Sequence, residues 1–379
     1  MNVFVAREMH PGETRVPLLP ANVQKLVKLG AAVAVEEGLG NALSFGDDAY
    51  AKVGADVVAR AAGLARADLV LRLRKPPLDD VARMRPGAVL VGLLDPFGSP
   101  DLLPALAARG VSAVSLELLP RTTLAQKMDA LSSQANLAGY VAVVLAASRS
   151  AKIFPMMSTP AGTIAPARVL VVGAGVAGLQ AIATARRLGA VVEAYDTRPA
   201  VEEQVRSLGA RFVKIDLGET GQTAGGYAKE LTPAQLELQR QALARHCAAA
   251  DVVIATAQVF GRRAPVLLTH DVVMGMAPGS LVVDLAVESG GNVEGIRLDE
   301  EIEINGVRLI GLGNLPGRVA YNASQMYANN LFNFVEHFWD RAAARFELRR
   351  ADELIAGALV THGGAVVHPA LRPASPKES

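Results

Sequence analysis

The stretch Val169-Leu-Val-Val-Gly-Ala-Gly-Val-Ala-Gly-Leu-Gln180 decides the fold of this chain. Four apolar residues predict a buried strand, and the glycines that follow have the spacing G-x-G-x-x-G. A helical pattern then runs from 176 to 188 and stops at Gly189, and a second apolar run, 190–195, leads to Asp196. This order of strand, turn, helix, strand and acid predicts a dinucleotide-binding βαβ unit.

Each residue of the turn has a predicted role in that unit. Gly173 permits the tight turn, Gly175 lets the backbone approach a pyrophosphate, and Gly178 lets the helix pack against the strand. The phosphates would lie on the N–H groups at the helix start, Val176 and Ala177. Asp196, eighteen residues after Gly178, would accept from ribose hydroxyls and repel a 2′-phosphate, which favours NAD(H) over NADP(H). The alternative is an ordinary βαβ unit whose glycines only make a turn.

Composition limits the classes of protein that this chain fits. Its 379 residues suit two domains, and a formal net charge of +1 favours neither nucleic acid nor an anionic membrane as a partner. The single Cys247 excludes disulfides within the chain and argues against a metal site, so we predict none. The first residues have neither a cationic start nor a long apolar core. We therefore expect a cytoplasmic protein without direct membrane insertion, which would serve a membrane process only by docking.

Short β-like runs alternate with helical patterns, which predicts an α/β fold of two Rossmann-like, doubly wound parallel sheets separated by a cleft. We expect an N-terminal domain over 1–132, completed by 322–379, and an NAD(H)-binding domain over 133–321. The helix-compatible segments 129–148 and 322–345 would connect them, the second with Met326, Asn330, Phe334 and Phe338 spaced four apart. The predicted strands are 2–5, 32–36, 68–72, 88–93, 111–115, 168–172, 191–195, 211–214, 251–256, 280–284 and 307–311. A helix should begin near Thr232 with a capping box to Gln235.

Two segments before the connecting helix carry polar groups. Arg15, just past the first strand, either clamps an anion or pairs with a neighbouring carboxylate, and spacing favours the carboxylate. In the segment 120–134, a helical conformation would place Gln126 and Asp129 on one face, with Arg121 and Ser132 near it. A carboxamide, a carboxylate and a guanidinium can together fix the amide of a nicotinamide ring. The alternative is a solvated helix start.

Further along, the segment 217–230 is dense in glycine and includes Gly226 and Tyr227. It is either a mobile lid or a surface loop. Thr256-Ala257-Gln258 and the segment 284–292 end two predicted strands at the edge where open α/β sheets bind ligands.

Together these segments resemble the NAD(H)-binding component, domain I, of proton-translocating nicotinamide nucleotide transhydrogenase. The likeness spans essentially the whole chain and rests on long blocks. They are Arg121-x-x-x-x-Gln-x-x-Asp with Leu-Ser-Ser-Gln-Ala-Asn-Leu-Ala-Gly-Tyr140, Phe154-Pro-Met-Met, Gly173 to Ala185, Thr223-Ala-Gly-Gly-Tyr-Ala-Lys-Glu, Asp284 to Asn292 and Ala365-Val-Val-His-Pro-Ala.

The resemblance implies a homodimer with NAD(H) in the cleft and direct hydride transfer to NADP(H) on a separate subunit, coupled to proton passage through a membrane subunit. Arg121, Gln126, Asp129 and Ser132 would hold the nicotinamide end. The pyrophosphate and adenosine end would be served by Val176, Asp196 and Arg198, and the closing loop by Gly226 and Tyr227.

Two other functions fit the same features. An amino-acid dehydrogenase similar to alanine dehydrogenase shares the Pro-Gly-Glu-x-Arg-Val start, but it needs a proton donor beside the reacting carbon. The position of its lysine is taken here by Arg74, which cannot cycle a proton, and Gly92-Leu-Leu-Asp-Pro-Phe departs from a His-containing pattern. A sensor that holds NAD(H) without turnover is the third possibility.

Overall fold

The computed structural model describes residues 1–218, 220–221 and 231–372. Contacts divide the chain into two compact units: unit 1, Met1–Gln134 with Val319–Ser379, and unit 2, Ala135–Arg318. The predicted boundaries, after 132 and after 321, fall two and three residues from these. Gly226 and Tyr227 lie outside the described residues.

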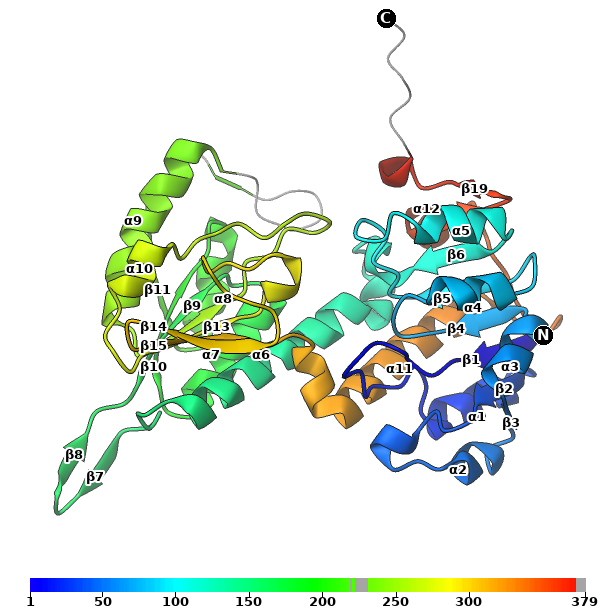
Figure 1. Cartoon of the computed structure of the whole chain (residues 1–379), viewed down its shortest axis with the longest axis horizontal. Coiled ribbons are helices and arrows are strands. Elements are labelled where there is room, and N and C mark those ends of the chain that lie inside the picture. The colour runs from blue at the N-terminus through cyan, green and yellow to red at the C-terminus, as the bar shows by residue number, and fades with distance from the viewer. Residues whose placement is uncertain (219, 222–230, 373–379) are drawn as a thin grey trace, which may run out of the picture. The chain divides into compact units, whose positions relative to one another are not determined.

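Unit 1 is built on an eight-stranded sheet in the order β19-β18-β6-β5-β4-β1-β2-β3 (Figure 1). Strands β1 to β6 run parallel, and β18 and β19 add an antiparallel edge. The strands are β1 Asn2–Val5, β2 Ala32–Glu36, β3 Asp56–Val58, β4 Leu69–Leu71, β5 Val89–Gly92, β6 Ser112–Ser115, β18 Leu359–His362 and β19 Ala365–Val366. The helices are α1 Pro20–Lys28, α2 Asp47–Ala51, α3 Arg60–Arg66, α4 Leu78–Arg83, α5 Leu102–Ala108, α11 Ala320–His337 and α12 Glu353–Ala358.

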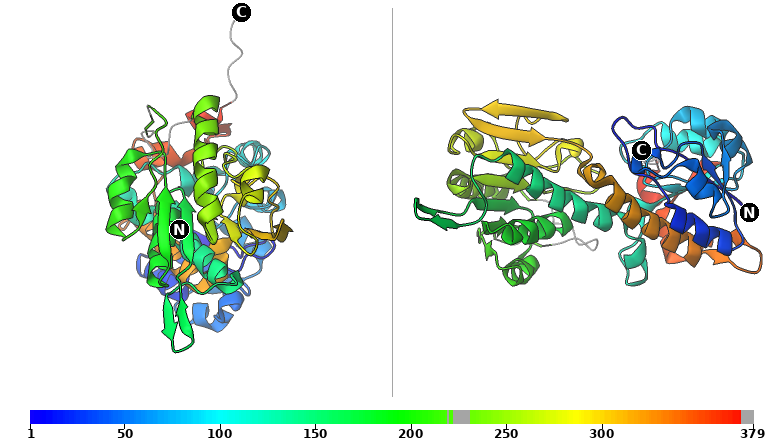
Figure 2. Two further views of the ribbon diagram at one scale, coloured as in Figure 1. Left: turned by 90° about the vertical axis from the view of Figure 1, so that its left-hand side faces the viewer. Right: turned by 90° about the horizontal axis from the view of Figure 1, so that it is seen from below.

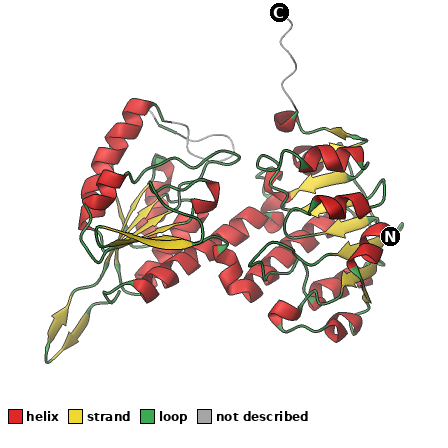
Figure 3. Cartoon of the chain, in the orientation of Figure 1, coloured by secondary structure: helices red, strands yellow, loops and turns green. Residues whose placement is uncertain are grey.

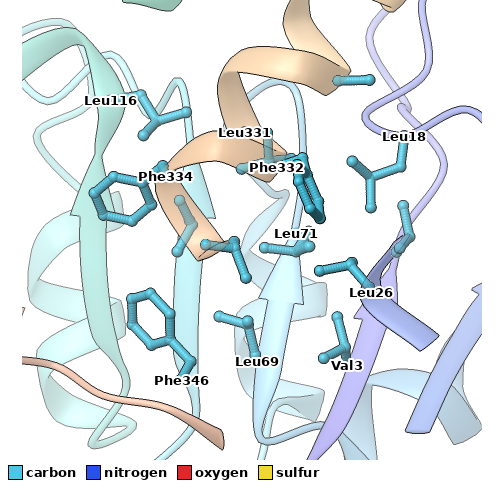
Figure 4. Close-up of a cluster of buried hydrophobic side chains, with 14 of the residues drawn as sticks. Val3, Leu18, Leu26, Leu69, Leu71, Leu116, Leu331, Phe332, Phe334 and Phe346 are labelled. Atoms are coloured by element: carbon cyan, nitrogen blue, oxygen red, sulfur yellow. The ribbon is translucent and has the colours of Figure 1, made fainter. Parts of the chain in front are cut away.

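The two faces of this sheet bury alternate residues of each strand, as the pleat requires. Val3 and Val5 join the core beneath α1, α11 and α12, whereas Phe4 joins the core beneath α3, α4 and α5. Figure 4 shows the first of these cores, with Phe334 and Leu331 of α11 against the sheet. Helices on both faces make this a doubly wound sheet, as the sequence predicts.

Unit 2 repeats this architecture with a seven-stranded sheet, in the order β11-β10-β9-β12-β13-β15-β14 (Figure 3). All neighbours pair in parallel except β14 with β15. The strands are β9 Arg168–Val172, β10 Val191–Tyr195, β11 Arg211–Phe212, β12 Val252–Ala255, β13 Leu281–Asp284, β14 Glu300–Ile304 and β15 Val307–Gly311. The helices are α6 Ala130–Arg149, α7 Val176–Arg187, α8 Glu202–Ser207, α9 Pro233–Ala249 and α10 His270–Met274. The capping box of α9 is confirmed, because Gln235 N donates to Thr232 Oγ1 at 3.3 Å and Thr232 N donates to Gln235 Oε1 at 2.9 Å.

Several predicted elements were wrong in extent. The strand at 211–214 ends at Phe212, and the helix predicted over 322–345 ends at His337. The residues that follow that helix form a small hairpin, β16 Trp339–Asp340 and β17 Arg345–Phe346. The side chain of Met326 is 42% exposed, so the buried face of α11 includes Tyr327 rather than Met326.

Helix α6 is long and apolar enough to cross a membrane by length and composition, with 39% of the tested window buried in the protein. One helix of this kind is weak evidence, because core helices pass the same test. Its Gly139 lies close against the start of α7, where an added Cβ would stand 2.1 Å from Ala177 O. This contact places the middle of α6 against protein.

Candidate functional site

The glycine turn of unit 2 has the geometry that its spacing predicts. Gly173 has φ +99°, and a Cβ there would lie 2.6 Å from Thr256 Oγ1. A Cβ on Gly178 would lie 1.8 Å from Gly173 O, so only glycine lets α7 approach β9 this closely. A Cβ on Gly175, in contrast, would meet nothing nearer than Arg198 Nη2 at 4.0 Å.

This open approach lies where α7 begins. Gly175 is the N-cap residue of α7, Val176 and Ala177 open its first turn, and the side chain of Val176 is 41% exposed. The first N–H groups of a helix point along its axis without helical partners, and they favour negative charge. The turn therefore fits a pyrophosphate that approaches over Gly175.

The turn also lies at the switch point of its sheet. The chain order reverses between β9 and β12, and ligands of open α/β sheets bind at the carboxyl edge there. Thr256, just after β12, donates through Oγ1 to Gly173 O at 2.9 Å. Gln258, two residues on, is exposed and donates through Nε2 to Leu285 O at 3.0 Å. The structure thus brings the glycine turn and the segment 256–258 together.

Asn292 holds this segment, a role that the sequence analysis did not foresee. Its buried carboxamide accepts from Ala257 N at 2.9 Å and donates to Ala257 O at 2.8 Å and Pro265 O at 2.9 Å. Asp284 in turn accepts from the backbone N–H groups of Ala286, Asn292 and Val293, and burial raises its pKa. The segment 284–292 therefore supports Ala257 from behind through buried groups.

At the end of β10, Asp196 lies beside the glycine turn. Its Oδ2 accepts from Ala174 N at 2.8 Å, which ties the second strand to the turn. Arg198 donates to the same carboxylate through Nε at 2.9 Å and Nη2 at 2.7 Å. The structure thus brings Asp196 and Arg198 together as an ion pair at the predicted ribose position.

In unit 1, the predicted nicotinamide residues gather around one corner of the chain. Residues Leu124–Met128 form a 3₁₀ helix rather than an α-helix, and α6 starts directly after Asp129. Asp129 caps α6, because its carboxylate accepts from Ser132 N at 2.9 Å and Ser132 Oγ at 2.6 Å. Arg121 and Gln126 are exposed on the segment leading into this corner.

Two asparagines of α11 hold the corner, and the sequence analysis did not identify them as such. Asn330 and Asn333 donate through Nδ2 to Lys127 O at 3.0 and 3.1 Å. Asn330 also accepts from Ser133 Oγ at 2.7 Å. The signal was present in the sequence, because a buried Asn in an otherwise apolar stripe requires polar partners.

The residues that would matter for a dehydrogenase are paired with carboxylates in unit 1. Arg74 Nε donates to Glu13 at 2.7 Å, and Lys75 Nζ donates to Asp95 at 2.9 Å. Arg15 pairs with Glu13 at 2.6 Å, which is the carboxylate interpretation favoured for it. Burial opposes ionisation of Glu13, but the hydrogen bonds and charge of Arg15 outweigh it and lower the pKa of Glu13 to about 2.

The doubly wound sheet of unit 2 and its glycine turn define a dinucleotide-binding α/β protein. Family models for the N-terminal and C-terminal domains of alanine dehydrogenase/PNT match residues 4–138 and 142–369. The chain belongs to this family, and within it to the group of transhydrogenase alpha subunits.

Individual relatives agree with that placement. An NAD(P) transhydrogenase subunit alpha protein from Rhodospirillum rubrum is 45% identical, covering 98% of this chain and 99% of its own length. The protein of the same name from Rickettsia prowazekii is 39% identical, covering 98% and 97%. Among solved structures, transhydrogenase from Sinorhizobium meliloti has a TM-score of 0.85 at 44% identity, covering 98% and 100%. An L-alanine dehydrogenase is more distant, with a TM-score of 0.80 at 26% identity, covering 98% of each chain.

Proposed function

We propose that this chain is the NAD(H)-binding subunit of a proton-translocating transhydrogenase. Its NAD(H) would exchange a hydride directly with NADP(H) bound to a second subunit, and a membrane subunit would couple the exchange to proton passage. The chain itself would lie on the cytoplasmic face of the membrane, held there by these partners. The observation that carries the proposal is the open approach to Gly175 at the switch point of unit 2.

Residue roles follow from this assignment. The pyrophosphate would lie on Gly173, Gly175, Val176, Ala177 and Gly178, and the adenosine ribose on Asp196. Arg121, Gln126, Asp129 and Ser132 would orient the nicotinamide. Thr256, Ala257 and Gln258 would contact the dinucleotide from β12, and Gly226 and Tyr227 would belong to a closing segment.

The pairing of Arg74 with Glu13 argues against the dehydrogenase alternative. Reduction of an imine or ketone needs a group that gives up a proton beside the carbon, and an arginine remains charged. Transfer between two nicotinamides needs no proton on either ring, only close alignment and exclusion of water.

Two assays separate these functions. The purified chain should not oxidise NADH with pyruvate and ammonia, but it should exchange hydride when mixed with an NADP(H)-binding partner. Robust alanine formation by the pure chain would overturn the proposal. Co-purification with membranes would favour the subunit over a free sensor, and failure of any membrane fraction to retain the chain would favour the sensor.

We also propose that the chain forms a homodimer through the hairpin of β7 Met157–Thr159 and β8 Gly162–Ile164 in unit 2. Figure 2 shows this hairpin extending away from the rest of its unit. Met157 and Ile164 form a cross-strand pair, and their side chains are 46% and 52% exposed. An isolated two-stranded hairpin is marginally stable in water, so an apolar face on one favours a partner.

Charging that face should separate the dimer. The double variant Met157→Glu, Ile164→Glu would bury two carboxylates in the interface, and we expect sedimentation velocity to give a monomer. Thr163→Glu is the matched control, because Thr163 pairs with Ser158 on the opposite face of the same hairpin. A double variant that sediments like the unsubstituted protein would contradict the hairpin interface.

A further inference from the structure

The Asp196 carboxylate has its acceptor positions filled by donors of the chain itself. Oδ1 accepts from Arg198 N at 2.9 Å and Arg198 Nε at 2.9 Å. Oδ2 accepts from Ala174 N at 2.8 Å and Arg198 Nη2 at 2.7 Å. An ionised carboxylate offers about four lone-pair sites, so these contacts saturate it.

This saturation bears on the role proposed for Asp196. To accept from the hydroxyls of an adenosine ribose, the carboxylate must first release donors. Two of its contacts are made by backbone N–H groups, which the turn and β10 hold in place. The other two are made by the guanidinium of Arg198, which sits on a flexible side chain. Two side-chain contacts can therefore be exchanged for two ribose hydroxyls without moving the backbone.

The guanidinium has a second place to go. Arg198 Nη2 lies 4.0 Å from the position of a Cβ on Gly175, the open side of the glycine turn. A pyrophosphate approaching over Gly175 would be within reach of the same side chain. Arginine binds phosphate oxygens through paired N–H donors, and these contacts are stronger than those between neutral groups.

We propose that Asp196 and Arg198 form a displaceable ion pair in which the ribose hydroxyls of a dinucleotide replace the guanidinium on Asp196. The guanidinium then pairs with the pyrophosphate. The pair thus couples recognition of the ribose to recognition of the phosphates. It also keeps Asp196 in place before the ligand arrives. The inference rests on the proposed NAD(H) site, and it adds an exchange that simple contact would not include.

The exchange predicts opposite effects of one substitution on ligands with and without phosphate. Arg198→Ala removes a competitor for Asp196, so adenosine should bind about 3-fold more tightly. The same change removes a charged partner of the phosphates, so ADP and NADH should bind about 10-fold more weakly. Arg198→Lys, which keeps the charge, should recover some of the ADP and NADH affinity. Isothermal titration calorimetry at one ionic strength measures all three ligands.

Arg206→Ala is the matched control, because Arg206 pairs with Glu202 on α8 and its side chain is 63% exposed. It removes one positive charge nearby without touching Asp196, and it should leave all three affinities unchanged. If Arg198→Ala weakens all three ligands alike, Arg198 only braces Asp196 and the exchange is wrong. If ADP affinity is unchanged, the guanidinium does not reach phosphate, and the exchange is again wrong. Failure of the unsubstituted chain to bind NADH would instead overturn the proposed function.

Discussion

Replacing Gly175 by valine should weaken NADH binding about 100-fold while leaving the fold intact. Gly175 has extended backbone angles, φ −76° and ψ −166°, which valine adopts without strain. The space that its side chain would enter is open, with Arg198 Nη2 at 4.0 Å as the nearest atom. The valine methyl groups would occupy the path of the pyrophosphate to the start of α7. The loss of several charge-assisted hydrogen bonds accounts for the size of the effect.

Two measurements check this expectation. Fluorescence titration gives the NADH dissociation constant, and urea unfolding gives the free energy of unfolding, which should change by less than about 0.5 kcal/mol. Adenosine, which has no phosphates, should bind Gly175→Val almost as well as the unsubstituted chain. Gly178→Ala provides the contrast, because its Cβ would clash with Gly173 O at 1.8 Å and should destabilise the unit itself. If Gly175→Val binds NADH normally, the pyrophosphate does not lie over this turn.

Replacing Gln126 by alanine should slow hydride transfer about 100-fold and change the NADH dissociation constant by less than about 3-fold. The exposed carboxamide of Gln126 sits on the 3₁₀ helix that leads to Asp129, where it can orient the nicotinamide amide. A ring displaced by about 1 Å loses alignment with its hydride partner, and such displacements cost about 100-fold in rate. Binding depends mainly on the phosphates and ribose, so it should change little.

Stopped-flow transfer with a partner subunit, together with NADH titration, separates the two quantities. Lys127→Ala is the matched control, since Lys127 is the exposed neighbour on the same turn. Tyr227→Phe, in the proposed closing segment, should instead weaken NADH binding modestly. Equal, small effects of Gln126→Ala and Tyr227→Phe on the transfer rate would contradict both assigned roles.

Much of the fold could be predicted from sequence because its signals are local. The parallel strands of both sheets are apolar runs bounded by glycine or charge, as in β9 and β12. Elements at the sheet edges were missed for the opposite reason. β3 has only three residues, and β14 reads Glu-Glu-Ile-Glu-Ile, an alternating pattern typical of a half-exposed antiparallel strand. β18 pairs with β6 across a separation in sequence that no local pattern reveals.

The site divides in the same way. The glycine turn could be predicted because its spacing encodes backbone geometry, as the positions of Gly173 and Gly178 confirm. The supporting residues could not, because Asn292 and Asn330 act through hydrogen bonds to Ala257 O and Lys127 O, which are remote in sequence. Likewise, Asp196 could be located by its distance from the turn. Its saturation by Arg198 depends on a side-chain conformation that spacing does not determine.

Deuteride transfer tests the central claim most directly. The chain, mixed with an NADP(H)-binding partner, would receive NADH carrying deuterium at one face of C4 at a time, together with NADP⁺. If the nicotinamide is presented to a second coenzyme, one of the two labelled forms should pass its deuterium wholly to NADPH, with none released to water. Loss of label to solvent, or oxidation of the labelled NADH by pyruvate and ammonia without the partner, would contradict the account.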